Sequence, residues 1–256
     1  MATKPKLLIA TPCYGGMITV SYFKSLMKLN NALQSLGIEF HILTKSNESL
    51  ITRGRNALVA EFIGRKQYTH LLWIDADMGF EPELIVKMLE IDQPVVGAAC
   101  PMKNIDWERV KQQAPRAKDG AQLRSLAMQY NINLVDENDR RVEKSLEIRN
   151  GFLEVSTVGT GIMMIRRDVF DIMREKLPDA AYTNDIAGYD NEYTRGNFYT
   201  FFDTMLHPVS KRYLSEDYAF CYRWVFLCGG NIYLNIEHKI VHFGSYPFTG
   251  AFIDNL

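Results

Sequence analysis

The order of apolar and polar positions along residues 6–99 follows two alternating patterns. Short apolar runs predict buried strands at 6–11, 39–43, 70–74 and 94–99. Between them, apolar residues recur every three or four positions, which predicts amphipathic helices at 21–36, 50–65 and 81–91. This alternation predicts an α/β fold, Rossmann-like, with a mostly parallel sheet covered by helices on both faces. The first helix is expected to bury Phe23, Leu26, Leu29 (or Met27) and Leu33.

The pattern changes between residues 103 and 150, where charged residues become dense and apolar residues thin out. We expect short helices at 107–113 and 121–130 and then a hairpin-like passage, and interpret the segment as an insertion in a single 1–256 domain. Strand and helix patterns return after it. They predict strands at 152–158, 161–165, 199–206, 232–236 and 239–242, helices at 167–176 and 214–227, and a long surface loop at 178–197.

Composition narrows the class of protein. Apolar residues make up 47% and charged residues 23% of the 256 residues, as in an ordinary soluble globular protein. The net charge of -1 argues against a nucleic-acid or general anionic-membrane partner. The 4 cysteines form no CxxC pair, so we expect reduced thiols in a cytoplasmic protein. The sequence shows neither a signal peptide nor an apolar stretch long enough to be a transmembrane segment.

Two carboxylates follow the apolar run 70–74 directly, at Asp75 and Asp77. Ligands of open α/β folds bind at the carboxyl ends of parallel strands, and a strand buried on both faces has no packing reason to end in acids. The Asp-x-Asp spacing suits a hard divalent cation that also holds phosphate oxygens. The alternative is a turn in which Asp75 caps the next helix and Asp77 is solvated.

Two metal-dependent enzyme classes place such a pair at a strand end. Phosphatases that use the first Asp as nucleophile carry it after the first strand of the domain, with Thr or Val two residues after the second Asp. Here the pair follows the third predicted strand and Gly79 takes that place, which disfavours a phosphatase. The other class is the nucleotide-sugar glycosyltransferases.

The segment Leu71–Met78 resembles the DXD motif of GT-A-type glycosyltransferases, and further stretches agree with the inverting family-2-like group in order and spacing. The resemblance runs from about residue 6 to residue 242 and leaves 103–150 unmatched, which we place on the acceptor side. The agreeing stretches are Thr11-Pro12-Cys13-Tyr14, Thr52-Arg53-Gly54-Arg55-Asn56, Ser215-Glu216-Asp217 and His242.

This resemblance implies a GT-A-like fold, a nucleoside-diphosphate-sugar donor (a UDP- or GDP-sugar), a glycan acceptor and a Mn²⁺ or Mg²⁺ ion. Such an ion neutralises the departing diphosphate, and Mn²⁺ tolerates an imidazole ligand better than Mg²⁺ does. A carboxylate takes the acceptor proton, for which Asp217 is the first candidate and Glu216 the second. The expected metal ligands are Asp77, Asp75 and His242. The expected donor contacts are Thr11, Pro12, Tyr14, Arg53, Arg55, Asn56, Ile74, Asp75, Ala76, Lys103 and Gly161.

Each assignment has a structural alternative. His242 is flanked by apolar residues and could be a hydrogen-bonded core histidine. The acids at 216 and 217 could serve only as the charged first turn of a helix. Arg53 and Arg55 could be surface charges, and Gly161 could belong to a simple turn. A sugar nucleotidylyltransferase would need an arginine in the loop 11–16, which has none, and a non-catalytic nucleotide- or sugar-binding module is the remaining alternative.

Overall fold

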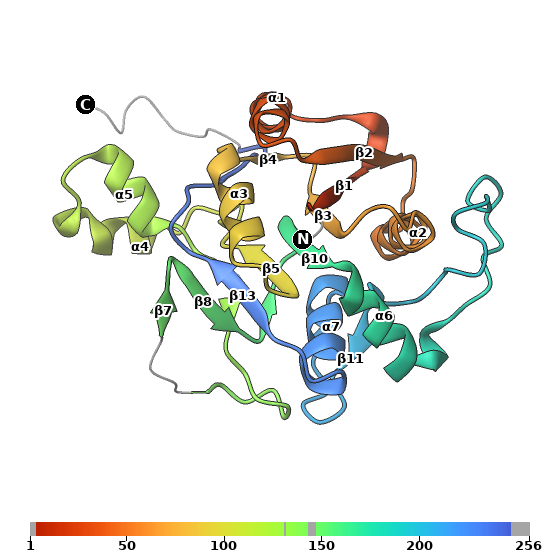
Figure 1. The fold of residues 1–256 in the computed structure, drawn as a ribbon. Helices are drawn as coiled ribbons and strands as arrows, with labels where there is room; N and C mark the ends of the chain where they lie inside the picture. The colour runs from red at the N-terminus through yellow and green to blue at the C-terminus, as the bar shows by residue number, and fades with distance from the viewer. Residues whose placement is uncertain (1–3, 131, 143–146, 247–256) are drawn as a thin grey trace.

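The computed structural model describes residues 4–130, 132–142 and 147–246. An eight-stranded sheet forms its centre, in the order β2-β1-β3-β10-β5-β13-β8-β7 (Figure 1). Strands β10 and β8 run antiparallel to their neighbours, and the remaining strands share one direction. The sheet strands are β1 (Lys6–Cys13), β2 (Glu39–Ser46), β3 (His70–Ile74), β5 (Val95–Ala98), β7 (Ile148–Arg149), β8 (Phe152–Val155), β10 (Ile162–Arg166) and β13 (Ile232–Asn235).

Helices cover both faces of this sheet, and short strands pair outside it. The helices are α1 (Val20–Ser35), α2 (Ile51–Gly64), α3 (Pro82–Glu90), α4 (Trp107–Gln113), α5 (Gly120–Ala127), α6 (Arg167–Lys176) and α7 (Glu216–Tyr222), which continues as a π-helical turn (Arg223–Leu227). The short pairs are β4 (Met78–Gly79) with β14 (Val241–His242), β6 (Ile132–Asn133) with β9 (Thr157–Val158), and β11 (Met205–Leu206) with β12 (Tyr213–Leu214). Single 3₁₀ turns lie at Tyr14–Gly16, Ala114–Arg116 and Pro178–Ala180.

Successive side chains of a strand point to opposite faces of the sheet, so the core consists of two layers, one on each face. Leu7 and Ile9 of β1 pack with residues of α1 and α3, whereas Leu8 and Ala10 pack with residues of α2, α6 and α7. Each strand of the sheet centre is therefore apolar on both faces, as the uninterrupted apolar runs predict. The predicted α/β class is confirmed in its mostly parallel sheet, its helices on both faces and its small insertion.

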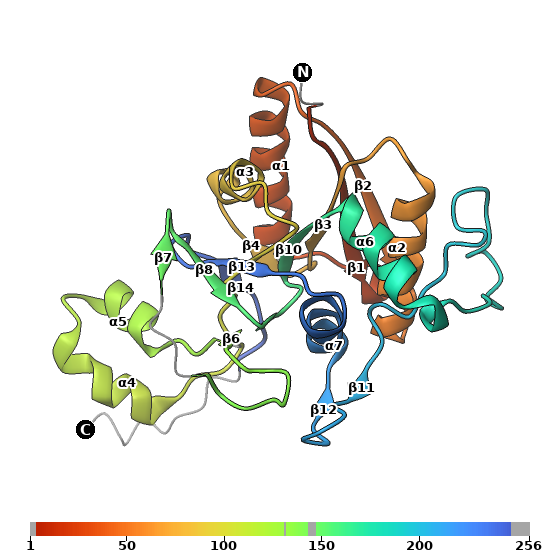
Figure 2. The same cartoon turned by 60° about the horizontal axis from the view of Figure 1, so that its bottom comes forward.

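The insertion forms a separate lobe of the same chain. Helices α4 and α5 pack on each other at the end of the molecule opposite α2 and α6 (Figure 2). Its later part crosses back to the core, where the turn residue Asp139 accepts hydrogen bonds from Ser210 and Arg212, both at 2.7 Å. The insertion thereby contacts the β11–β12 hairpin, which leads into α7.

Three predictions of local structure are wrong. Residues 199–206 form no continuous strand, because Phe201 and Phe202 turn into the core and Phe202 stacks on Phe220 at 4.4 Å between ring centroids. The strand expected at 239–242 is reduced to Val241–His242. Phe23 and Met27 of α1 are exposed, because Tyr22, Ser25, Leu29 and Leu33 form the face that packs on the sheet.

The predicted loop at 178–197 is confirmed, and it is held against α2. Asn191 donates to Glu61 at 2.6 Å, and the Arg65 guanidinium lies 3.9 Å from the centroid of the Tyr193 ring. Gly64 permits this approach, since a Cβ at that position would lie 1.9 Å from the Tyr193 carbonyl oxygen. None of the helices in the described ranges is long and apolar enough to cross a membrane.

Candidate functional site

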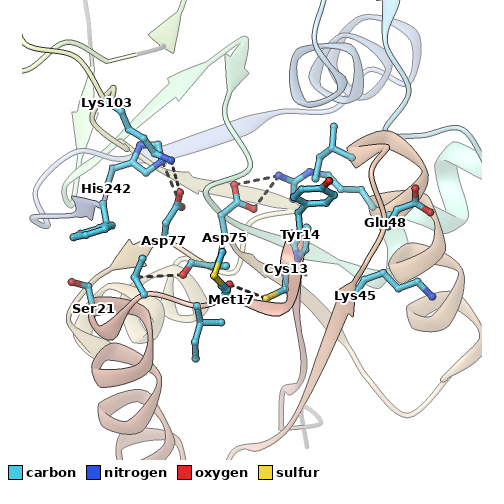
Figure 3. Close-up of a pocket in the computed structure, with 18 of the residues that line it drawn as sticks. Cys13, Tyr14, Met17, Ser21, Lys45, Glu48, Asp75, Asp77, Lys103 and His242 are labelled. Carbon is cyan, nitrogen blue, oxygen red and sulfur yellow. Dashed lines mark hydrogen bonds and ion pairs between the residues drawn. The ribbon is translucent and has the colours of Figure 1, made fainter. Parts of the chain in front are cut away.

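A cavity of about 810 Å³ opens at the carboxyl ends of β1 and β3 (Figure 3). The register of the two strands pairs Ala10 with Trp73, so the residues that follow each strand emerge at the same edge of the sheet. The volume lies in the range of small-molecule and cofactor sites. The lining side chains come from the β1–α1 segment, the end of β2 and the loop after it, the start of α2, the Asp-x-Asp turn, Lys103, and the end of β14 with the residue that follows it.

Asp77 forms the polar wall of this cavity together with Lys103 and His242. The Lys103 ammonium donates a hydrogen bond to Asp77 Oδ2, and His242 Nε2 lies 3.6 Å from Asp77 Oδ1. The pairing of β14 with β4 places His242 opposite Met78 and adds a bond from the Phe243 amide to the Asp77 carbonyl at 2.9 Å. The three polar side chains lie on one side of the cavity, with Tyr14, Lys45 and Glu48 at its other end (Figure 3).

A backbone contact fixes the orientation of the His242 ring. Its Nδ1 lies 2.8 Å from the Pro101 carbonyl oxygen, which can only accept, so Nδ1 carries the proton. The lone pair of a neutral imidazole is then on Nε2, the nitrogen that faces Asp77. A carbonyl partner on the second ring nitrogen is the arrangement that orients metal-binding histidines.

These side chains fit a divalent ion as an open, incomplete ligand set. Asp77 and His242 would hold such an ion, since the facing carboxylate oxygen and imidazole nitrogen lie 3.6 Å apart. In the described parts of the chain no group of three or more His, Cys, Asp or Glu side chains is arranged to hold a metal. Asp77 and His242 are therefore two neighbouring groups of the kind that bind divalent ions, fewer than a site built by the protein alone would need.

Asp75 points to a different partner, the buried guanidinium of Arg55. Arg55 Nη2 lies 3.0 Å from Asp75 Oδ1, and Arg55 Nε lies 3.2 Å from Glu216 Oε1. Arg55 thereby joins α2, the end of β3 and the start of α7. Burial by itself lowers the pKa of Arg55, but the two carboxylates raise it overall, so the side chain stays charged. Burial raises the pKa of Asp75, and Arg55 opposes this change.

Replacing Arg55 by Met is expected to lower the free energy of unfolding by about 3 kcal/mol, because it removes a buried cation and leaves two partly buried carboxylates side by side without it. Urea denaturation measures the change. Arg149→Met is the matched control: its ion pair with Glu147 is exposed, and we expect a change within about 0.5 kcal/mol. A loss below about 1 kcal/mol in Arg55→Met would show that the triad does not stabilise the fold.

The structure brings together only part of the predicted donor site. The lining of the cavity includes Pro12, Tyr14, Arg55, Asp75, Ala76, Asp77, Lys103 and His242. The other predicted donor residues lie behind it, in contacts with the protein itself. Thr11 bonds Tyr22 at 2.8 Å, Arg53 pairs with Glu48 at 2.7 Å, Asn56 accepts from the Phe202 amide at 2.9 Å, Gly161 accepts from the Asp75 amide at 2.9 Å, and Ile74 is buried in β3.

Glu216 and Asp217 begin α7, outside the lining of the cavity. Glu216 is engaged by Arg55. Asp217 Oδ1 accepts from the Ser215 hydroxyl and from the Tyr218 amide, the latter at 2.8 Å. Ser215 takes the N-cap position of α7, although its side chain bonds Asp217 instead of a free backbone amide of the helix. Gly159 places no side chain against Asp217 Oδ2, where a Cβ would lie 3.4 Å from that oxygen.

Sequence reasoning missed Glu48, which organises the far end of the cavity. Its carboxylate accepts from Arg53, from the Leu50 amide at 2.9 Å and from the Tyr189 hydroxyl at 2.6 Å. The bond from Arg53 is the main cause that lowers the pKa of Glu48 to about 2. Glu48 lies just before a predicted helix, where acidic residues are favoured, and this position alone could have indicated a structural role for it. Tyr189 comes from the distant loop, and no local pattern indicates that contact.

No protein-family model matches the sequence, and no curated protein matches it. Solved structures similar to this chain include A197 from STIV, which is 17% identical with a TM-score of 0.47, over 94% of this chain and 86% of that one. A glycosyltransferase involved in glycosylation of the major capsid of PBCV-1 is 12% identical with a TM-score of 0.33, over 70% of this chain and 71% of that one. A putative glucose-1-phosphate thymidylyltransferase from Bacillus anthracis is 13% identical with a TM-score of 0.33, over 75% and 84%.

Proposed function

We propose that the protein is a metal-dependent glycosyltransferase that moves a sugar from a UDP- or GDP-sugar to a hydroxyl of a glycan or other acceptor. The observation that carries this proposal is the polar wall of the cavity, where Asp77 meets Lys103 and His242. A carboxylate, an ammonium and an oriented imidazole together suit a diphosphate that arrives with a divalent ion.

The donor diphosphate lies against this wall in the proposal. Lys103 moves from Asp77 to the phosphate oxygens, because a diphosphate offers it a greater concentration of negative charge. The nucleoside takes the other end of the cavity, where Pro12, Tyr14 and Ile51 provide apolar surface for a planar base.

Asp77 and His242 hold the ion, Mn²⁺ by preference and Mg²⁺ as the alternative, because the ligand set includes a nitrogen. When bound, the ion supplies the positive charge that stabilises the diphosphate leaving group. Asp75 shares its carboxylate with Arg55 and acts mainly by positioning the turn that carries Asp77, so Asp77 ranks before it as a ligand.

Asp217 is the proposed base of a single inverting displacement. It takes the proton of the acceptor hydroxyl as that oxygen attacks the anomeric carbon. Three features support it over Glu216. The bond from Ser215 fixes the Asp217 carboxylate, and Gly159 places no side chain against its second oxygen. The Glu216 carboxylate is already engaged by the Arg55 guanidinium at 3.2 Å, whereas Asp217 has no such ion pair in the described part of the chain.

A donor-turnover assay tests this function. The protein is incubated with UDP- and GDP-sugars in Mn²⁺, and the release of nucleoside diphosphate is followed with water or added glycans as acceptor. We expect release from at least one donor, and loss of release when a chelator removes the ion. Release of nucleoside monophosphate would point instead to cleavage within the diphosphate, and release that persists in chelator would contradict the metal assignment.

A further inference from the structure

The face of α1 that points away from the sheet carries large apolar side chains. Val20, Phe23 and Met27 are 69%, 53% and 48% exposed. Their spacing of three and four residues puts them on one side of the helix, where neighbouring side chains touch. The opposite side is already occupied by the core, so α1 is apolar on both sides and one of them has no partner within the described residues.

This apolar face continues into the mouth of the cavity. Val20 lines the cavity, and so do Tyr14, Met17 and Ile18, which precede α1 and are also exposed. Thr19 joins this segment to the Asp-x-Asp turn, because its amide donates to the Ala76 carbonyl at 2.9 Å. Scattered exposed apolar residues are normal, but a contiguous patch on a rigid helix beside a ligand cavity indicates a surface that another molecule covers.

The charges on α1 indicate the chemistry of that molecule. The helix sequence contains Lys24 and Lys28 and no acidic residue. Lys28 is neutralised by Glu81 at 2.6 Å, whereas Lys24 makes no ion pair within the described part of the chain. Lys24 lies one helical turn after Val20, on the exposed face. Exposed apolar side chains beside an unpaired lysine are complementary to a lipid interface that carries negative head groups.

We propose that Met17, Val20, Phe23, Lys24 and Met27, here named the α1 surface, bind the interface of an anionic lipid bilayer. The helix lies along the interface and does not cross it. The net charge of -1 provides no long-range attraction for the whole chain, so the lysine acts only at contact, and the apolar side chains supply most of the affinity. On the basis of the proposed function, the mouth of the cavity then faces the lipid, and the acceptor hydroxyl belongs to a lipid-anchored molecule.

Co-sedimentation with lipid vesicles tests this surface without any nucleotide. The vesicles contain either phosphatidylcholine alone or equal parts of phosphatidylcholine and phosphatidylglycerol. We expect the protein to bind the mixed vesicles, and the double variant Phe23→Ser, Met27→Ser to bind them at least about tenfold less, because it removes two apolar side chains that lie outside the cavity lining. Lys24→Gln is expected to weaken binding to the mixed vesicles and to leave binding to phosphatidylcholine unchanged.

A double variant of two other exposed apolar residues, Leu206→Ser with Val209→Ser near the β11–β12 hairpin, is the matched control and is expected to bind as the wild type does. Circular dichroism and thermal unfolding establish that the variants are folded.

The proposal is overturned if the wild type does not bind the mixed vesicles or if the Phe23, Met27 variant binds them equally well. Light scattering that shows a dimer, dissociated by the same two changes, would assign the surface to a second copy of the chain instead. Failure of nucleotide binding would contradict the proposed function and leave the vesicle result intact.

Discussion

Asp77→Asn is expected to lower the rate of donor turnover by about 10³-fold or more while the protein stays folded. The change removes the negative charge that holds the ion and leaves a side chain of the same shape. The Asp77 side chain is 29% exposed and pairs only with groups of the cavity wall, so the fold does not depend on its charge. Steady-state release of nucleoside diphosphate in Mn²⁺ measures the effect.

Asp190→Asn is the control for this variant, because Asp190 is an exposed acid on the loop beside α2, outside the cavity lining. We expect wild-type turnover from it. Binding of Mn²⁺ measured by electron paramagnetic resonance in the presence of UDP should be lost in Asp77→Asn and kept in Asp190→Asn. Near-normal turnover in Asp77→Asn would show that this carboxylate does not hold an ion needed for the reaction.

Asp217→Asn is expected to lower kcat by about 10³-fold, within the range that removal of a general base produces, with little change in the affinity for nucleoside diphosphate. The two effects should separate because Asp217 lies outside the lining of the cavity. Asparagine keeps an oxygen that can accept from Ser215 and from the Tyr218 amide, so the start of α7 should keep its geometry.

The comparison with Glu216→Gln decides between the two acids of this motif. Removing the Glu216 charge weakens its contact with Arg55 and should lower the free energy of unfolding more than Asp217→Asn does. If Glu216→Gln abolishes turnover and Asp217→Asn does not, then the roles are reversed. If neither change affects the rate of transfer to an acceptor, then a base on α7 is excluded.

Most of the fold could be predicted because its strands are buried on both faces. A short, uninterrupted apolar run such as that of β3 indicates a strand buried on both faces. In the helices between such runs, apolar residues recur every three or four positions, which indicates an amphipathic helix. The prediction was wrong where tertiary contacts outweighed local preference. Phe201 and Phe202 look like strand residues, but they pack on α6 and α7, and α1 has enough apolar residues that the period did not reveal which side is buried.

The candidate site was predictable where it depends on strand ends and not where it depends on distant contacts. The position of Asp75 and Asp77 after a parallel strand is sufficient to place them at the edge of the sheet. The pairing of β14 with β4, which brings His242 to Asp77, joins segments more than 160 positions apart, and only the resemblance indicated it. The sequence around Arg55 does not indicate that its side chain is buried between two acids. Nor does the sequence around Asn56 indicate that its side chain is buried behind the cavity.

Calorimetric titration of UDP and GDP, each with Mn²⁺ and with a chelator, tests the central claim most directly. We expect one of the two nucleotides to bind in Mn²⁺ and its affinity to fall at least about tenfold in chelator, because Asp77 and His242 then lose the ion that joins them to the diphosphate. In Asp77→Asn the affinity in Mn²⁺ should equal that of the wild type in chelator. Absence of binding by both nucleotides in Mn²⁺, or an affinity that is the same with and without the ion, would contradict a metal-dependent nucleotide site in this cavity.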